Sequence, residues 1–229
     1  MASHKELTMI QTTQALGELA TLYPGATLTF LRHRLDFCCG GRRSLGDACD
    51  ALGLNTSAVI AELEALAATD SGNDRWDLQP TRELVAHILV RYHASLRLDL
   101  PALIAAAEKV ERVHASRSAC PRGLADHLHR VYVSLLEHMS KEEEVLFPAL
   151  LSGTHGAALQ MPIHVMTQEH DDHGVHLKRT RELADDFQAP EDACGTWRAL
   201  YDGLAKLEAE LMEHIHLENN VLFPRAVQA

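Results

Sequence analysis

Two matching stretches of sequence decide the fold of this chain. The first is EHMSKEEEVLFP at residues 137–148, and the second is EHIHLENNVLFP at residues 213–224. In each stretch a glutamate follows a histidine by four positions: Glu142 follows His138, and Glu218 follows His214. Both stretches end in Val-Leu-Phe-Pro. Two copies of one helical pattern, 76 residues apart, indicate two related helices and a two-fold arrangement of their polar side chains.

The composition and the spacing of apolar residues also favour helices. Of the 229 residues, 46% are hydrophobic but only 5% are aromatic, which is typical of helical packing rather than of a disordered chain or a β-sandwich. Long helical patterns cover roughly residues 81–114, 121–150, 158–187 and 194–226, with short turn-rich joints between them. Short joints make neighbouring helices antiparallel, so we predict an all-α fold built on an antiparallel four-helix bundle.

A small helical module is expected before the bundle. Ser44 and Asn55 stand where the caps of two short helices are needed, and turn-forming residues separate the short helices of this region. The polar stretch at residues 69–74 lacks periodicity, which indicates a linker. We therefore predict a cysteine-containing module at residues 1–75 and the bundle at residues 76–229.

Charge and hydropathy argue against two classes of partner. The formal net charge is −11 and no Lys/Arg run extends beyond Arg42-Arg43, so we expect no nucleic-acid partner. No apolar stretch approaches the roughly 18 residues that span a bilayer, and the first residues lack an apolar signal core. We expect no membrane partner and a cytoplasmic location, where the five cysteines remain free thiols.

The repeated stretches carry the chemical signal. His138 and Glu142 stand one helical turn apart, as do His214 and Glu218, so each pair presents an imidazole and a carboxylate on one side of its helix. Apolar residues follow both glutamates within a few positions. A carboxylate buried among such residues is costly without a cation to neutralise it, which favours a metal site.

One histidine in each of the other two long helices completes the ligand set. His93 in the first helix and His170 in the third are 77 residues apart, close to the offset of the repeat. Helical bundles build metal sites from inward-facing residues, and imidazole with carboxylate but without thiolate suits iron or manganese. Six ligands are enough for two ions and leave coordination positions for a small molecule. The predicted metal ligands are His93, His138, Glu142, His170, His214 and Glu218.

Several neighbouring residues are candidates for supporting roles. We interpret Glu143 and Glu144 as solvated, because they lie around the helix from the predicted ligand. The Phe-Pro pairs at 147–148 and 223–224 are interpreted as core packing and helix termination. The candidates for hydrogen-bonding or proton-relay roles beside the ligands are His87, His164, Glu169, His173, His176 and His216.

The adjacent thiols of Cys38 and Cys39 form a second candidate site, apart from the predicted metal ligands. A following turn at Gly40-Gly41 would leave both thiols accessible and near backbone N–H donors, which lower a thiol pKa. In the alternative interpretation they are two small apolar residues at a helix end. Cys38 and Cys39 are the candidate catalytic residues. The cysteines that we interpret as buried thiols are Cys49, Cys120 and Cys194.

In combination, these motifs resemble the RIC family, for repair of iron centres, also called the YtfE/ScdA group. The resemblance covers essentially the whole chain. It implies a hemerythrin-like bundle with two non-haem iron ions, oxo-bridged when ferric, held by the six predicted ligands with both glutamates as bridges. The motifs that carry it are FCCGG at residues 37–41, VRYH at 90–93, KVERVH at 109–114, EHD at 169–171 and the two repeated stretches.

The resemblance also implies a function in the nitrosative and oxidative stress response. It implies repair of damaged iron–sulfur clusters by supply of iron, with damaged iron–sulfur proteins, nitric oxide and an unidentified reductant as partners of a monomer or homodimer. Two alternatives stay open: a nitric oxide scavenger or reductase that forms nitrous oxide at the di-ferrous site, and a redox or oxygen sensor. The sequence does not decide whether the protein is an enzyme, because iron donation and nitric oxide chemistry need the same di-ferrous site.

Overall fold

The computed structural model describes residues 9–67 and 75–228, which fall into two units. The first unit consists of the amino-terminal residues up to Gln79 together with Ile215–Pro224, and the second consists of Pro80–His214 with the residues from Arg225 onward. The linker predicted at residues 69–74 lies outside the described residues.

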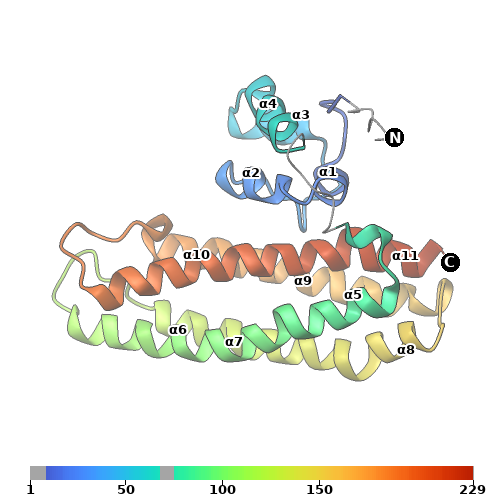
Figure 1. Ribbon diagram of the computed structural model, residues 1–229. Coiled ribbons are helices and arrows are strands. Elements are labelled where there is room, and N and C mark those ends of the chain that lie inside the picture. Colours follow the sequence, from blue (N-terminus) through green and yellow to red (C-terminus); the bar gives the residue numbers. More distant parts are fainter. Residues whose placement is uncertain (1–8, 68–74, 229) are drawn as a thin grey trace, which may run out of the picture. The chain divides into compact units, whose positions relative to one another are not determined.

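The bundle consists of four long helical stretches that lie side by side and are joined at alternating ends, which confirms the antiparallel prediction (Figure 1). The first stretch contains α5 (Thr81–Ile88), η2 (Leu89–His93) and α6 (Ala94–Val113), and the second contains α7 (Leu124–Lys141), η3 (Glu142–Leu146) and α8 (Phe147–Leu151). The third is α9 (Ala157–Leu183), and the fourth contains α10 (Gly195–His216), η5 (Leu217–Leu222) and α11 (Phe223–Gln228).

Apolar spacing explains how these helices pack. In α7, which lies against both α6 and α9, the side chains of Leu124, Leu128, Val131 and Leu135 are buried. Their separations of three and four residues place them on one side of the helix, which is the pattern of a core-facing stripe. The bundle core therefore follows directly from the sequence.

Three π-helical turns interrupt the bundle helices. They are η2, η3 and η5, and each contains one predicted ligand, namely His93, Glu142 and Glu218 respectively. A π turn adds a residue to the helical repeat and shifts the direction of the side chains around it. Such turns are frequent at functional sites, and the apolar periodicity of the sequence does not reveal them.

The prediction that the Phe-Pro pairs terminate their helices is wrong. The chain stays helical from Phe147 to Leu151 and from Phe223 to Gln228. Pro148 stands directly after η3, near the start of α8, and the helix continues for three residues beyond it. Both phenylalanines are buried, as core packing requires.

The amino-terminal unit contains α1 (Leu16–Leu22), α2 (Ala26–Arg32), α3 (Leu45–Leu52), α4 (Thr56–Ala67) and the 3₁₀ turn η1 (Trp76–Leu78). Both predicted caps are present: Ser44 Oγ accepts a hydrogen bond from the Asp47 amide at 3.1 Å, and Asn55 Oδ1 accepts one from the Ala58 amide at 3.2 Å. Phe30 and Phe37 are fully buried in this unit.

No β-strand occurs in the described ranges, where an isolated bridge joins Ala15 and Ser44. The all-α class is therefore confirmed. Among the helices described, none has both the length and the apolar character needed to cross a membrane. A further 3₁₀ turn, η4 (Asp185–Phe187), follows α9.

Candidate metal centre

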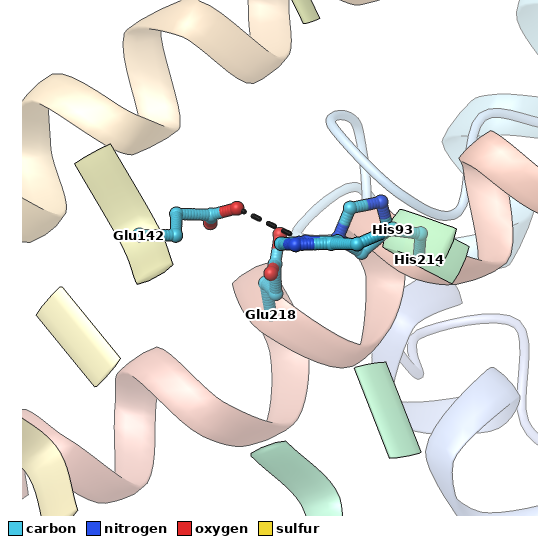
Figure 2. A group of neighbouring side chains, drawn as sticks. All are labelled: His93, Glu142, His214 and Glu218. Carbon is cyan, nitrogen blue, oxygen red and sulfur yellow. Dashed lines mark hydrogen bonds and ion pairs between the residues drawn. The ribbon is translucent and has the colours of Figure 1, made fainter. Parts of the chain in front are cut away.

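The predicted ligands form two groups of donor atoms. In each group the donor atoms all lie within 4.8 Å of one another, and none of the residues is more than 2% exposed. The first group contains His93, Glu142, His214 and Glu218 (Figure 2). The second group contains His138, Glu142, His170 and Glu218. The two groups therefore share both carboxylates, while each has two histidines of its own.

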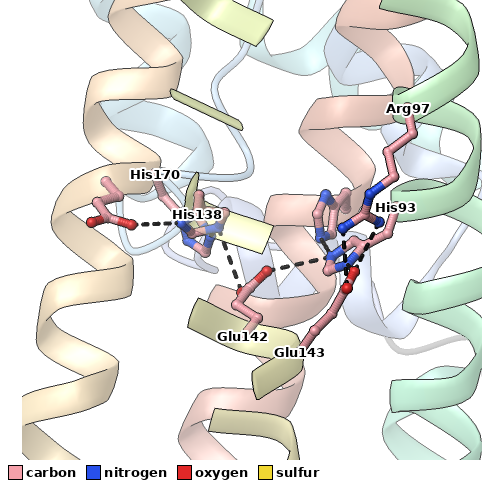
Figure 3. A network of polar contacts seen from close by, with 8 residues as sticks. His93, Arg97, His138, Glu142, Glu143 and His170 are labelled. Atoms are coloured by element: carbon pink, nitrogen blue, oxygen red, sulfur yellow. Dashed lines mark hydrogen bonds and ion pairs between the residues drawn. The ribbon is translucent and has the colours of Figure 1, made fainter. Parts of the chain in front are cut away.

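Glu142 lies between histidines of the two groups. Its Oε2 atom lies 3.3 Å from His93 Nε2, and its Oε1 atom lies 3.5 Å from His138 Nε2 (Figure 3). Each oxygen thus faces a different group. A carboxylate in this position is suited to join two cations, one through each oxygen.

The histidines of each group point their Nε2 atoms toward each other. These atoms are 3.2 Å apart for His93 and His214, and 3.1 Å apart for His138 and His170. In both pairs the rings meet edge to face. Convergence of two ring nitrogens on a carboxylate oxygen is the arrangement that ligands of a common ion require.

The chemistry of the donor set fits iron. Each group offers two imidazole nitrogens and two carboxylates, and neither contains a thiol. Borderline nitrogen donors combined with hard oxygen donors suit iron, whereas thiolates would favour copper(I) or structural zinc. Burial of two carboxylates in a helical core also requires a positive charge nearby, which a cation supplies.

The outer nitrogen of His93 is held by a carboxylate and a cation. His93 Nδ1 lies 2.7 Å from Glu143 Oε1, and Arg97 binds both oxygens of Glu143 at 2.9 and 3.0 Å (Figure 3). With the proton on Nδ1, the lone pair of Nε2 faces the donor group. The interpretation of Glu143 as solvated is therefore wrong, whereas Glu144 is exposed as expected.

His138 has the same kind of support from another helix. His138 Nδ1 lies 2.9 Å from Glu169 Oε2, and Lys141 Nζ pairs with the other oxygen of Glu169. The structure thus places Glu169 in the supporting position that the sequence suggested. Glu143, Arg97 and Lys141 were missed, although the helical spacing of Arg97 from His93 and of Lys141 from His138 was a usable signal.

Electrostatics keeps Glu143 ionised. Partial burial acts to raise the pKa of Glu143, but hydrogen bonds from Arg97 and His93 outweigh it and lower the pKa below its ordinary value. An ionised carboxylate accepts the His93 Nδ1 proton more strongly than a neutral one does.

The other candidate histidines have different surroundings. His173 is buried, and its ring centre lies 5.0 Å from that of His138. His87 contacts the ring of Tyr92, and Tyr92 in turn stacks on His214 with ring centres 5.4 Å apart. Tyr92 was not among the predicted site residues. His164 is exposed.

His176 and His216 contact other residues of the protein. The carbonyl of His176 accepts a hydrogen bond from His127 at 3.1 Å. His216 contacts the ring of Phe37 and the Asn220 amide, and burial lowers its pKa to about 4 despite a hydrogen bond to the Phe37 backbone. The His216 imidazole is therefore neutral at pH 7.

The prediction of accessible, low-pKa thiols is wrong for Cys38. Its side chain is only 3% exposed, and its Sγ atom lies 3.6 Å from Cys39 Sγ and 3.3 Å from Asp36 Oδ1. The hydrogen bond with Cys39, followed by burial and the charge of Asp36, raises the pKa of Cys38 well above its usual value. The Cys39 amide donates to Asp36 rather than to a thiolate, and Cys39 is partly exposed.

The remaining cysteines follow the sequence interpretation in two cases out of three. Cys49 and Cys120 are buried. Cys194 is exposed, which corrects the prediction, and its Sγ atom lies 3.2 Å from His114 Nε2. Cys194 directly precedes α10, where the chain enters a new helix at the surface.

Two family models match this chain. Residues 84–226 match the hemerythrin HHE cation-binding domain, and residues 12–67 match the ScdA_N domain, described as a domain of unknown function. The chain is 46% identical over 215 residues to the iron–sulfur cluster repair protein YtfE of Yersinia pseudotuberculosis, and equally similar to YtfE of Yersinia pestis. These alignments cover 94% of this chain and 97% of each relative.

This chain belongs to the YtfE family of iron–sulfur cluster repair proteins. The resemblance noted in the sequence is thereby confirmed. The hemerythrin match spans all six predicted ligands, and the ScdA_N match spans Cys38 and Cys39. In this member of the YtfE family, the buried histidine and glutamate groups lie in a cation-binding domain, as an iron-binding function requires.

Proposed function

We propose that this protein repairs damaged iron–sulfur clusters by supplying iron from a pair of non-haem iron ions in its bundle. The Yersinia relatives are named iron–sulfur cluster repair proteins. The structural observation that carries the proposal is the position of Glu142, whose two oxygens face histidines of different donor groups. That position supports two ions sharing a bridging carboxylate rather than one isolated ion.

The proposed ligand set leaves the site positively charged. Two ferrous ions balanced by two carboxylates retain a net positive charge and have coordination positions beyond the six protein ligands. When bound, the iron pair supplies Lewis acidity and a change of oxidation state, and we propose that it is oxo-bridged when ferric. His93 and His214 would hold one ion, His138 and His170 the other, and Glu142 and Glu218 would bridge them.

The protein residues around the ligands support reversible binding of iron. Glu143 and Glu169 accept the Nδ1 protons of His93 and His138, which keeps the Nε2 lone pairs directed inward. Neutral imidazoles add no negative charge to the site, so they favour ferric iron less than additional carboxylates would. The proposed partners are damaged iron–sulfur proteins, which accept the iron, and a reductant that keeps it ferrous.

Reactivation of a damaged enzyme tests this proposal. An iron–sulfur enzyme inactivated by nitric oxide is incubated with iron-loaded parent protein, with Glu142→Leu or with Glu144→Leu. Glu144 is an exposed neighbour on the same helix and serves as the matched control. The parent and Glu144→Leu should restore activity, whereas Glu142→Leu should retain less than half of the iron and restore little. Equal iron content and equal reactivation by Glu142→Leu would contradict the assignment.

The coordination positions beyond the protein ligands favour a second candidate, removal of nitric oxide. Two ion positions that share a carboxylate bring two nitric oxide molecules close enough to be reduced together. Two molecules, two electrons from the reductant and two protons give nitrous oxide and water. A single-turnover reaction of the reduced protein with nitric oxide tests this candidate: nitrous oxide indicates a reductase, and a stable nitrosyl without nitrous oxide indicates binding alone.

A further inference from the structure

We propose that Asp36, Cys38 and Cys39 form a second metal site, which lies in the amino-terminal unit and takes a divalent cation such as Fe²⁺ or Zn²⁺. The three residues lie in the segment between α2 and α3, and their donor atoms are within 4.8 Å of one another. The site would supply two sulfur ligands and one oxygen ligand. It is separate in composition from the groups of the bundle, which contain no thiol.

Two of the three distances between the donor atoms are close to those of a tetrahedral site. With metal–sulfur bonds of about 2.3 Å and metal–oxygen bonds of about 2.1 Å, a tetrahedron has S···S edges of about 3.8 Å and S···O edges of about 3.6 Å. The Sγ atoms of Cys38 and Cys39 are 3.6 Å apart, and Cys38 Sγ is 3.3 Å from Asp36 Oδ1. These two distances are within a few tenths of an ångström of the tetrahedral values, and the donor atoms of Cys39 and Asp36 lie within 4.8 Å of each other.

The backbone of this segment is held in place by other residues of the same unit. Asn219 Nδ2 and Asn220 Nδ2 donate to the Cys38 carbonyl at 3.3 and 3.4 Å, and Asp36 Oδ1 accepts from the Cys39 amide at 3.0 Å. These contacts hold the backbone from which both cysteine side chains project. Preorganisation of this kind lowers the cost of assembling a metal site.

The two glycines after the cysteines allow this close packing. A Cβ atom on Gly40 would lie 2.8 Å from the Asp36 carbonyl oxygen and 3.2 Å from its carboxyl carbon. A Cβ atom on Gly41 would lie 2.6 Å from Asn220 Oδ1. The missing Cβ atoms of Gly40 and Gly41 thus leave room for Asp36 and Asn220 beside the cysteine segment. They do not serve to expose the thiols.

The ligands suit a cation that is bound and then transferred to another protein. On binding, each ligating thiol loses its proton to water and forms a metal–sulfur bond, and the oxidation state of the cation does not change. Asp36 and Cys39 are partly exposed, so three protein ligands leave a fourth position open to an acceptor. Cluster-binding sites use cysteine thiolates, which exchange iron with other thiolates. This physiological role rests on the proposed function, whereas metal binding by the three residues does not.

Cobalt binding to the full-length protein tests the site, with the bundle already loaded with iron. Thiolate-bound Co²⁺ has an intense near-ultraviolet charge-transfer band, and we expect one equivalent to produce it. The double variant Cys38→Ser with Cys39→Ser should lose the band, and Asp36→Asn should weaken binding by about tenfold. Cys194→Ser, which changes an exposed thiol, should keep it. Iron content and helical circular dichroism confirm that each variant is folded.

Absence of the band in the parent, or an unchanged band in the double variant, would overturn the site. The contacts of Cys38 would then be thiol hydrogen bonds only. Reactivation of a damaged enzyme is scored separately, so the two proposals fail independently. If the parent binds no cobalt but still reactivates the enzyme, only the second site is overturned. Cobalt binding by a parent that does not reactivate it supports the site and overturns the proposed function.

Discussion

At the scale of single residues, adjacent glutamates contact opposite nitrogens of one imidazole. Glu142 lies 3.3 Å from His93 Nε2, and Glu143 lies 2.7 Å from His93 Nδ1. The inner carboxylate belongs to both donor groups, whereas the outer one is bound by Arg97 and is partly exposed. The orientation of His93 is therefore set from outside the donor group, by a residue that does not belong to it.

Removing the charge of Glu143 should loosen the proposed iron site without unfolding the bundle. In Glu143→Gln the side chain keeps its size but binds the Nδ1 proton of His93 less strongly, so we expect about tenfold weaker affinity for ferrous iron. Competition with a ferrous chelator measures the affinity. Glu144→Gln, an exposed change one residue further on, should leave it unaltered. Identical affinities for Glu143→Gln and the parent would show that this contact has no role in binding.

The sequence predicted the residues of the two donor groups better than the residues that surround them. The His-x-x-x-Glu pairs could be recognised because histidine and glutamate one turn apart occur twice in apolar surroundings. Glu143 could not be placed, because the π turn η3 changes the direction of the side chains that follow Lys141. The sequence left the burial of Cys38 open, and the asparagines that bind its carbonyl, Asn219 and Asn220, lie more than 180 residues away in sequence.

At the scale of helices, a buried histidine links α7 to α9. His127 Nε2 lies 3.1 Å from both the His176 carbonyl oxygen and Thr180 Oγ1. Burial lowers the pKa of His127, although the hydrogen bond to the His176 carbonyl acts in the opposite direction. The folded protein therefore holds this imidazole neutral at a pH where an unfolded chain would protonate it.

This lowered pKa makes the stability of the bundle depend on pH. As the pH falls below about 6.5, the unfolded state binds a proton that folded His127 resists, so stability decreases until the pH passes the folded pKa. In His127→Gln this part of the pH dependence should disappear, and at pH 7.5 the lost buried contacts should cost about 1–3 kcal/mol. The stability difference between parent and variant should therefore be larger at pH 7.5 than at pH 5.5.

Denaturant unfolding at the two pH values measures that difference. His129→Gln is the matched control, because His129 is exposed and pairs with Glu108 at the surface. It should lower the stability at pH 7.5 far less than His127→Gln does, because an exposed pair contributes little. A difference between parent and His127→Gln that is the same at both pH values would contradict the proposed titration of His127.

At the scale of the whole molecule, one short segment contains both a predicted metal ligand and residues that contact Cys38. Ile215–Pro224 is grouped with the amino-terminal unit, although it contains the end of α10, all of η5 and the start of α11. It contains Glu218, a member of both donor groups, and the asparagines that hold the Cys38 backbone. The composition and periodicity of the sequence predicted the bundle, but they did not predict this division, which arises from contacts between distant parts of the chain.

Isotope transfer tests most directly whether the bundle supplies iron. The full-length protein is loaded with ⁵⁷Fe, freed of unbound iron and incubated, under reducing conditions, with a damaged iron–sulfur enzyme in medium containing only natural-abundance iron. The account predicts that the reactivated enzyme carries a cluster enriched in ⁵⁷Fe, with a matching loss of label from the donor. Reactivation with a cluster of natural isotopic composition, while the label stays in the bundle, would contradict it.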